Sequence, residues 1–256
     1  MRYSPHQAMK VGRDRIAEIA RKLAEARRVS ILTGAGVSAE SGVPTFRGPE
    51  GLWRKFRPEE LATPEAFARD PRLVWEWYDW RRQKVASCRP NRGHEALAGI
   101  EPAFEDFTLV TQNVDGLHRA AGSRRVCELH GNIWILRCTG CHRREEDRRT
   151  PLLELPPRCR CGSLLRPDVV WFGEALPAEP LSRSVEAMRR CQLLLVVGTS
   201  ALVHPAGSLP VLAKQSGALV VEVNRERTPL SGLADATLLG PSATFLPELC
   251  RGAGLL

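Results

Sequence analysis

The chain has 256 residues, 43% of them hydrophobic, which is enough for one large domain or for one domain with a smaller insertion. No apolar run approaches the ~20 residues of a membrane span, and the first residues lack the apolar stretch of a signal peptide, so we expect a cytoplasmic protein without a membrane partner. A net charge of +8 would attract nucleic acid or an anionic ligand, but charge alone argues for solubility, and the sequence holds no helix-turn-helix or RNA-binding sheet motif.

The predicted elements alternate between helices and short apolar strands. Apolar residues at helical spacing predict a helix over 10–28, and the strand 29–32 follows it directly. Residues 50–87 predict a small helical insertion, because Thr63 and Asp70 each stand before a proline, as helix caps do. The remaining predicted segments are the helices 92–100, 181–190 and 209–216 and the extended segments 107–111, 126–129, 168–172, 192–197 and 218–223.

Strands that are almost continuous in Val, Leu and Ile and alternate with helices predict a Rossmann-like α/β fold, in which helices cover both faces of a parallel sheet. Polar clusters follow five of these strands, at 34–36, 112–115, 130–131, 198–200 and 224–226. Ligands of such folds bind beyond the carboxyl ends of the strands, so we expect these clusters to form one site. We expect a single domain whose larger part covers about 10–48, 88–134 and 168–256, and whose smaller part combines the helical insertion 49–87 with a zinc-binding module at 135–167.

The segment 33–48, TGAGVSAESGVPTFRG, follows the first strand and carries the strongest ligand signal. Gly34 and Gly36 would let the backbone come close to a phosphate, because a Cβ at either position would crowd it. The next glycine is Gly42, six residues after Gly36, whereas the usual dinucleotide fingerprint has its third glycine three residues on. The segment therefore predicts a polyphosphate ligand that is not held by the usual fingerprint.

Four of the eight cysteines form two close pairs, Cys138 with Cys141 and Cys159 with Cys161. Two such pairs predict a structural zinc ion held by four thiolates, with no open position for catalysis. A redox-active dithiol is the alternative, but it needs no second pair. The other four cysteines stand among apolar or helical residues, and we expect them to be core residues.

Three further residues lie in positions suited to catalysis. His130 follows a predicted strand and precedes a glycine, where acid–base work and a hydrogen-bonded core histidine are both reasonable interpretations. Asn113 and Asp115 lie in the segment QNVDG, which turn chemistry alone would explain, although an amide and a carboxylate could also hold a ribose or order a water. The residues alone leave these alternatives open.

The motifs GAGVSAESG, PTFRG, TQNVDGLH, ELHGN, the two cysteine pairs, VVWFGE, VVGTS and VNRE occur in this order along the chain. In this combination the sequence resembles the sirtuins, a family of NAD-dependent protein-lysine deacylases. The resemblance implies that NAD is consumed: nicotinamide leaves, the acyl-lysine oxygen attacks the ribose, and His130 takes a proton from a ribose hydroxyl, giving free lysine and O-acyl-ADP-ribose. It also implies catalytic roles for Asn113 and Asp115 and one structural Zn²⁺ at the four paired cysteines.

The resemblance further implies which residues hold the two substrates. The NAD contacts would be Gly34, Ala35, Gly36, Ser38, Ala39, Thr45, Phe46, Arg47, Trp53, Gln112, Asn113, Val114, Asp115, Gly198, Thr199, Ser200, Asn224, Arg225, Glu226 and Ala243. The residues Val170, Trp171, Phe172, Gly173 and Glu174 match the strand beside which an acyl-lysine peptide would lie as an added strand.

Tyr78 and Arg81 are three residues apart, so on a helix they share one face, and a phenol beside a guanidinium can receive a carboxylate. An aromatic packing stripe with a surface arginine is the alternative. Together with Ala39 and PTFRG, this spacing resembles the class III sirtuins, which remove succinyl, malonyl and glutaryl groups. Two other functions stay open: a mono-ADP-ribosyltransferase on the same scaffold, and a non-catalytic, basic zinc-containing module that binds nucleic acid.

Overall fold

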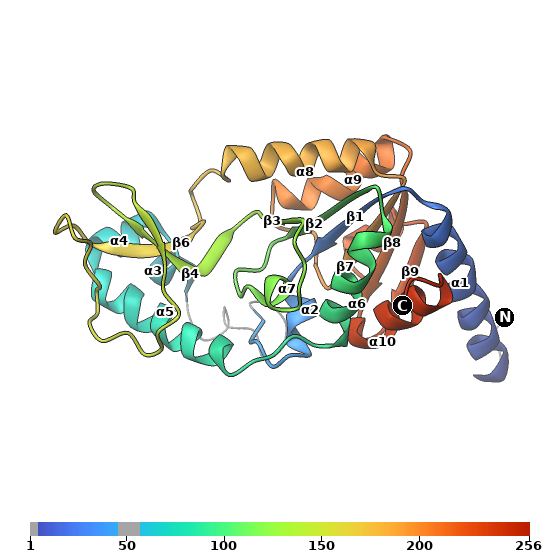
Figure 1. Cartoon of the computed structure of the whole chain (residues 1–256), viewed down its shortest axis with the longest axis horizontal. Coiled ribbons are helices and arrows are strands. Elements are labelled where there is room, and N and C mark those ends of the chain that lie inside the picture. Colours follow the sequence, from blue (N-terminus) through green and yellow to red (C-terminus); the bar gives the residue numbers. More distant parts are fainter. Residues whose placement is uncertain (1–4, 46–56) are drawn as a thin grey trace.

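The computed structural model describes residues 5–45 and 57–256, with side chains described for 14–45, 57 and 59–256. Figure 1 shows a larger part built on one sheet and a smaller part built on a second sheet and a helical insertion. The larger sheet has the strand order β3-β2-β1-β7-β8-β9, and all neighbouring strands are parallel. Its strands are β1 Arg28–Thr33, β2 Asp106–Thr111, β3 Val126–Glu128, β7 Leu193–Val197, β8 Leu219–Asn224 and β9 Ala236–Leu239.

Helices cover both faces of this sheet, as predicted (Figure 1). Two helices pack on one face, where Met188 and Leu32 share a core, and three pack on the other, where Leu97 and Ile31 share a second core. The first two are α8 Ala178–Arg190 and α9 Leu209–Gln215, and the other three are α1 Pro5–Glu25, α6 Arg92–Ile100 and α10 Ser242–Gly252. Neighbouring residues of one strand therefore enter different cores, which explains the unbroken apolar runs of the strands.

The smaller part packs the helical insertion against an antiparallel sheet. In this sheet, β4 (Gly131–Cys138) pairs with β5 (Arg144–Glu146) and with β6 (Leu165–Val169). The insertion contains α3 Pro58–Leu61, α4 Pro64–Arg69 and α5 Pro71–Ala86. Thr63 and Asp70 cap α4 and α5 as predicted, since their side chains accept backbone N–H groups at 3.1 and 3.0 Å.

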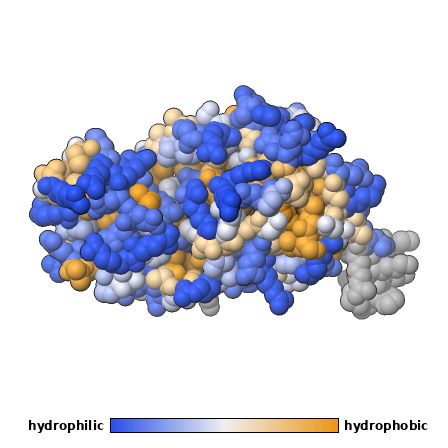
Figure 2. All heavy atoms as spheres, in the orientation of Figure 1, coloured by the Kyte–Doolittle hydropathy of each residue, from blue (hydrophilic) through white to orange (hydrophobic). Residues whose placement is uncertain are grey.

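Short elements complete the chain: α2 Ala35–Ala39, α7 Leu117–Ala120, and 3₁₀ turns at Glu101–Ala103, Ala206–Ser208 and Pro229–Gly232. Figure 2 shows hydrophilic residues over most of one face of the molecule, including the smaller part at the left and α8 at the top. Among the helices of the described residues, none combines the length and the apolar character that crossing a membrane requires.

Two predicted elements differ from the structure. The helix expected over 10–28 ends at Glu25, because Arg28 already belongs to β1 and lies opposite Asp106 of β2. The extended segment expected at 168–172 is displaced, since β6 pairs with β4 only as far as Val169, and the chain turns at Gly173 with φ +86°. The residues from 170 onward therefore leave the sheet and are available to line a site.

Candidate active site

The polar segments that follow five strands meet at one edge of the parallel sheet, as predicted. They follow β1, β2, β3, β7 and β8, whose carboxyl ends all lie at the same edge. The strand order reverses between β1 and β7, which is the kind of position where ligands of such folds bind. There the amide of Gly34 donates to the carbonyl of Val197 at 3.0 Å, and the amide of Gly36 donates to the carbonyl of Gly198 at 2.8 Å.

The glycines of this segment also allow close packing between two backbone segments, a role that the sequence did not predict. A Cβ at Gly36 would lie 2.7 Å from the Cα of Gly198, and a Cβ at Gly34 would lie 2.7 Å from the Cβ of Thr199. Gly198 itself has φ +58°, and a Cβ there would lie 2.4 Å from the nitrogen of Val37. The segments after β1 and β7 thus pack backbone against backbone, and side chains at these positions would push them apart.

Side-chain amides connect the segments further. Gln112 Nε2 donates to Thr199 Oγ1 at 2.9 Å, and Asn224 Nδ2 donates to the carbonyl of Thr199 at 3.0 Å. Asn113 Nδ2 lies 3.1 Å from both the carbonyl of Gly34 and the hydroxyl of Ser38, to which it donates. Segments from four strands are thereby tied together, so the residues predicted to contact NAD lie side by side.

A chain of hydrogen bonds runs from Asn91 through the buried His94 to the buried Ser38. His94 Nδ1 accepts the amide of Asn91 at 3.2 Å, so Nε2 carries the proton and donates to Ser38 Oγ at 3.3 Å. Because Asn113 also donates to Ser38, the Ser38 hydroxyl keeps its own proton for a further acceptor. Burial raises the pKa of Asp115, whereas its hydrogen bonds, the one from Ser38 included, act to lower it. His94 was not among the predicted site residues, and its only signal in the sequence is its place in the capping pattern Asn-x-x-His at the start of α6.

His130 follows β3 and has one ring nitrogen occupied. Nδ1 lies 3.0 Å from the carbonyl oxygen of Gln112, which can only accept, so Nδ1 carries the proton and Nε2 keeps a free lone pair. Burial lowers the pKa of His130, and the hydrogen bond to Gln112 acts in the opposite direction. The imidazole is therefore neutral at neutral pH, and Nε2 is able to accept a proton.

The predicted adenine contact, Ala243, is linked to the end of α2 through Glu40. The carboxylate of Glu40 accepts the amide and the hydroxyl of Ser242 at 2.8 and 3.0 Å and the amide of Ala243 at 3.2 Å. A carboxylate at the start of α10 also interacts favourably with the helix dipole. Glu40 stands inside the GAGVSAESG motif, yet the motif alone did not show this contact.

The helix α5 places Tyr78 and Arg81 on one buried face, in agreement with their spacing. Their exposed fractions are 2% and 9%, so the interpretation of Arg81 as a surface arginine is wrong. The guanidinium lies 4.8 Å from the ring centre of Trp77 and 5.4 Å from that of Tyr78. Burial lowers the pKa of Arg81, and the charges of Tyr78 and Asp115 counteract this. The pair thus adjoins the segment that carries Asp115.

The next residue, Arg82, has an unrelated structural role. It is 0% exposed and donates to the carbonyls of Ile133 at 2.9 Å, Asp147 at 2.5 Å and Arg149 at 3.1 Å. Arg82 therefore joins α5 to the smaller sheet, while Arg81 faces the candidate site.

The segment 170–174 connects the surroundings of His130 with the insertion. The amide of Val170 donates to the carbonyl of His130 at 2.9 Å, and the amide of Phe172 donates to the carbonyl of Ala62 at 2.9 Å. Trp171 is 3% exposed, and its indole N–H donates to Tyr78 Oη at 2.9 Å. Phe172, in contrast, is 46% exposed. The segment predicted to meet a peptide therefore buries the side chain of Trp171 and exposes that of Phe172.

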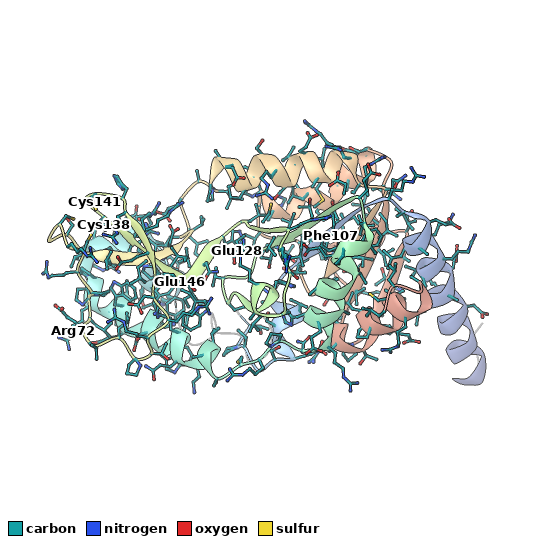
Figure 3. The ribbon with its side chains drawn as sticks, in the orientation of Figure 1. Arg72, Phe107, Glu128, Cys138, Cys141 and Glu146 are labelled. Carbon is teal, nitrogen blue, oxygen red and sulfur yellow. The ribbon has the colours of Figure 1, made fainter. Side chains whose placement is uncertain are left out.

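The four predicted cysteine ligands cluster at the far end of the smaller part, and Figure 3 shows Cys138 and Cys141 well away from Glu128 of β3. All four sulfurs lie within 4.8 Å of one another, with 3.4 Å between Cys138 and Cys161 and 3.7 Å between Cys141 and Cys159. Sulfurs bound tetrahedrally at the usual Zn–S distance of ~2.3 Å are ~3.8 Å apart. The cluster therefore fits a structural zinc ion, whose four positions the thiolates would fill.

The arginines around this cluster are largely engaged in ion pairs. The pairs are Arg143–Glu145 at 3.6 Å, Arg144–Asp168 at 3.0 Å, Arg148–Glu146 at 2.5 Å and Arg149–Asp147 at 2.6 Å. Compensated charges of this kind favour a solvated surface over a nucleic-acid site.

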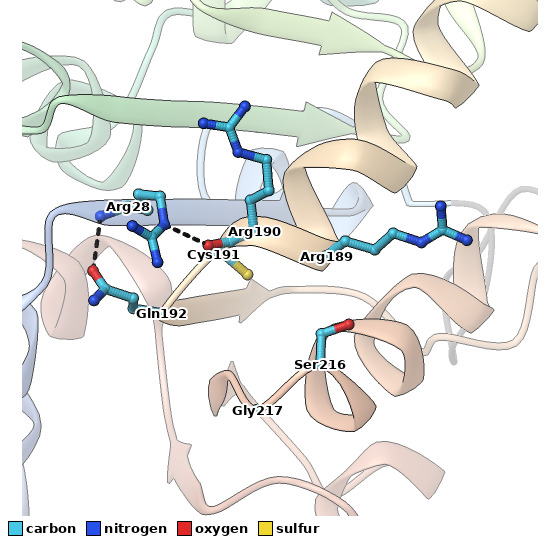
Figure 4. Close-up of a pocket in the computed structure, with 7 residues that line it drawn as sticks. All are labelled: Arg28, Arg189, Arg190, Cys191, Gln192, Ser216 and Gly217. Carbon is cyan, nitrogen blue, oxygen red and sulfur yellow. Dashed lines mark hydrogen bonds between the residues drawn. The ribbon is translucent and has the colours of Figure 1, made fainter.

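A hollow of about 420 Å³ lies at the opposite edge of the parallel sheet (Figure 4). Its lining consists of Arg28, Arg189, Arg190, Cys191, Gln192, Ser216 and Gly217. Arg28 Nε donates to the carbonyl of Arg190 at 2.7 Å, and Figure 4 shows the side chains of Arg189 and Arg190 pointing in different directions. None of the described site residues lines this hollow, so it is separate from the candidate site.

The other predicted residues fall into three groups. Phe46, Arg47 and Trp53 lie outside the described residues. Ala35, Ala39, Thr45, Val114 and Ser200 are half-buried at the strand ends, and Arg225 and Glu226 are exposed after β8.

The comparisons with known proteins agree with this geometry. The sequence pattern of the Sir2 family matches residues 34–205. A protein of Aquifex aeolicus (strain VF5) named NAD-dependent protein deacylase is 57% identical over 219 residues, which covers 85% of this chain and 92% of that protein. An NAD-dependent protein deacylase 1 of Archaeoglobus fulgidus is 49% identical over 235 residues, covering 91% of this chain and 96% of that protein.

Solved structures give the same result. A Sir2 homologue in complex with NAD is 48% identical, has a TM-score of 0.88, and covers 93% of this chain and 94% of its own. The structure of Sir2Af2 bound to a myristoylated histone peptide is 33% identical, with a TM-score of 0.76 and coverage of 94% and 97%. Since the family pattern, the identity along the whole fold and the arrangement of the strand ends all agree, this chain belongs to the Sir2 family.

Proposed function

We propose that this protein removes acyl groups from protein lysines with consumption of NAD, and that it accepts succinyl- and malonyl-lysine as well as acetyl-lysine. The products are nicotinamide, O-acyl-ADP-ribose and free lysine. Relatives named NAD-dependent protein deacylases, together with similar structures that hold NAD or an acylated peptide, support the general reaction. The acyl preference rests on the residues of α5 and the segment 170–174.

The assignment of NAD follows from the strand ends. The segment 34–39 and residues 198–200 are proposed to hold the phosphates, and residues 224–226 the adenosine ribose. NAD supplies the ribose carbon that receives the acyl oxygen as nicotinamide leaves. Asn113 and Asp115, which are both buried, are proposed to hold the neighbouring ribose. His130 takes a proton from a ribose hydroxyl through Nε2, because Gln112 occupies Nδ1.

The buried pair of Tyr78 and Arg81 carries the proposal of a dicarboxylic acyl group. Removing a guanidinium from water is costly, and a substrate carboxylate that pairs with Arg81 would offset much of that cost. A phenol and a guanidinium supply several donors and suit a carboxylate better than the methyl group of an acetyl substrate. An acyl chain that ends in a carboxylate is therefore the substrate that matches these residues.

A comparison of acylated peptides tests the proposal. The protein is incubated with NAD and either succinyl-lysine or acetyl-lysine peptide of the same sequence, and nicotinamide and deacylated peptide are measured by mass spectrometry. Arg81→Met should lower kcat/KM on the succinyl peptide about 10- to 100-fold more than on the acetyl peptide, the range expected for hydrogen bonds to a charged group. Arg72→Met serves as the control, because Arg72 lies on the same helix but is exposed and paired with Glu76 (Figure 3).

The possible outcomes separate the two parts of the proposal. Failure to release nicotinamide with either peptide would reject the deacylase function, and label from NAD that remains on protein would favour ADP-ribosyl transfer. Equal losses on both peptides in Arg81→Met would reject the carboxylate receptor alone.

A further inference from the structure

We propose that Trp171 is a specificity-determining residue, whose indole N–H turns the hydroxyl of Tyr78 into a donor for the carboxylate of a dicarboxylic acyl group. This inference rests on the proposed function and adds a residue outside the pair of Tyr78 and Arg81. Trp171 acts through Tyr78, so it is a positioning residue.

The hydrogen bonds of the Tyr78 oxygen carry the first step. An indole N–H can only donate, and Trp171 Nε1 lies 2.9 Å from Tyr78 Oη, so the phenol oxygen accepts this bond. The guanidinium of Arg81, in contrast, lies over the ring of Tyr78, 5.4 Å from its centre. The bond from Trp171 places an N–H group on the phenol oxygen, so the hydroxyl proton of Tyr78 remains to be donated.

The direction of this proton is the second step. A phenol O–H prefers the plane of its ring and so has two positions, and a donor that occupies one side leaves the other side for the proton. Within residues 5–45 and 57–256, no acceptor takes this proton. Burial raises the pKa of Tyr78, so the hydroxyl stays protonated. A buried donor without an acceptor is costly, and a carboxylate oxygen of the substrate would supply the acceptor.

The indole itself is held firmly, which is the third step. The guanidinium carbon of Arg166 lies 3.4 Å from the ring centre of Trp171, and Phe67 contacts the same indole with ring centres 5.3 Å apart. Arg166 binds Glu174 through two hydrogen bonds of 2.6 and 2.9 Å. Glu174 in turn accepts the backbone amide of Trp171 at 2.8 Å. Because the ring and the backbone of Trp171 are both fixed, its N–H is preorganised towards Tyr78.

The backbone connects this arrangement with the reacting end of the substrate. Val170, the residue before Trp171, donates its amide to the carbonyl of His130. Trp171 would help to recognise the far end of the acyl chain, and His130 would take the proton. These two residues therefore belong to adjoining segments. A shift of Trp171 would change the position of the acyl end relative to His130.

The competing explanation is that the bond between Trp171 and Tyr78 only satisfies two buried polar groups. In that case the loss of the N–H would affect all acyl substrates alike. The two explanations therefore differ in the ratio of succinyl to acetyl turnover rather than in stability.

The test replaces Trp171 by groups that lack the N–H. Trp171→Phe, and a second variant in which the indole is replaced by the isosteric benzothiophene, are assayed for kcat/KM on succinyl and acetyl peptides with NAD. The ratio of succinyl to acetyl kcat/KM should fall about five- to tenfold, the size of one net hydrogen bond. Trp75→Phe is the matched control, because the buried Trp75 on α5 donates its N–H to the carbonyl of Leu165 at 2.8 Å, away from Tyr78, and its ratio should stay unchanged.

A double-mutant cycle with Tyr78→Phe completes the test. If Trp171 acts through the Tyr78 hydroxyl, Trp171→Phe should cause no further fall in the ratio once that hydroxyl is absent. An unchanged ratio in the benzothiophene variant, or additive effects in the cycle, would overturn the inference while the response of Arg81→Met still supports the proposed function. A wild-type protein that turns over acetyl but not succinyl peptide would overturn both the acyl preference and this inference.

Discussion

Replacing Gly36 by alanine should destabilise the fold even without a nucleotide. The added Cβ would lie 2.7 Å from Gly198 Cα and 2.8 Å from Gly198 O, whereas ordinary contacts of a Cβ begin at 3.4 Å. The segments after β1 and β7 would have to separate by several tenths of an ångström, which weakens the 2.8 Å hydrogen bond from the Gly36 amide to the Gly198 carbonyl.

The expected size of this effect combines three contributions. Overpacking of a filled site costs about 1–3 kcal/mol, and the weakened hydrogen bond costs about 1 kcal/mol. Alanine in the helix α2 recovers about 1 kcal/mol relative to glycine. We therefore expect the free energy of unfolding to fall by about 2 kcal/mol, which lowers the melting temperature by about 4–8 °C for a chain of this size.

Urea denaturation of the NAD-free protein, followed by far-UV circular dichroism, measures this change. Gly232→Ala is the matched control, since Gly232 is exposed and a Cβ there would meet nothing within 4 Å. Its stability should stay within about 0.5 kcal/mol of wild type. If Gly36→Ala is as stable as the control and only its KM for NAD rises, the glycine serves the phosphate alone and the packing argument is refuted.

Three further predictions concern other parts of the molecule. Burial lowers the pKa of His94 from 6.5 to about 4, so the unfolded chain takes up a proton between these values that the folded protein does not. The free energy of unfolding should therefore fall by about 3 kcal/mol from pH 6.5 to pH 4 on account of this group, and calorimetry of His94→Asn should show a shallower fall than the exposed His142→Asn. Cys141→Ser should lower the zinc content measured by atomic absorption and the melting temperature, and full zinc retention would contradict the four-thiolate site. Glu40→Gln removes one acceptor from the Ser242 and Ala243 amides, so the KM for NAD should rise several-fold while the KM for peptide stays constant; the reverse pattern in steady-state kinetics would reject the link to the adenine end.

Much of the candidate site was predictable because it depends on local patterns. The apolar strands and the polar residues after them were readable in order, and parallel strands necessarily bring their carboxyl ends to one edge. The caps at Thr63 and Asp70 depend on residues three positions away, so their spacing was sufficient. The close cysteine pairs likewise indicate a metal site by their spacing alone, and the 3.4 Å between the sulfurs of Cys138 and Cys161 agrees with it.

Other features depend on contacts that no short stretch of sequence contains. Arg81 and Arg82 are adjacent arginines that the sequence does not distinguish. The packing of α5 places Arg81 against Tyr78, whereas it lets Arg82 donate to three carbonyls of the smaller part. The extended segment was predicted at 168–172, but β6 ends at Val169, because its pairing with β4 ends there. His94 and Glu40 look like ordinary helix residues in the sequence, since the burial of His94 and the contacts of Glu40 with Ser242 and Ala243 are properties of the assembled fold.

The amino-acid sequence is enough to predict the order of β1, β2, β3, β7 and β8, the edge of the sheet at which their polar segments lie, and the group of four cysteines. This prediction is possible because hydrophobic periodicity, capping and ligand spacing act over a few residues. The close approach of Gly36 to Gly198 and the hydrogen bond from Trp171 to the hydroxyl of Tyr78 are visible only in the folded protein. Those contacts join residues far apart in the chain, and their distances are set by how the sheets and helices pack.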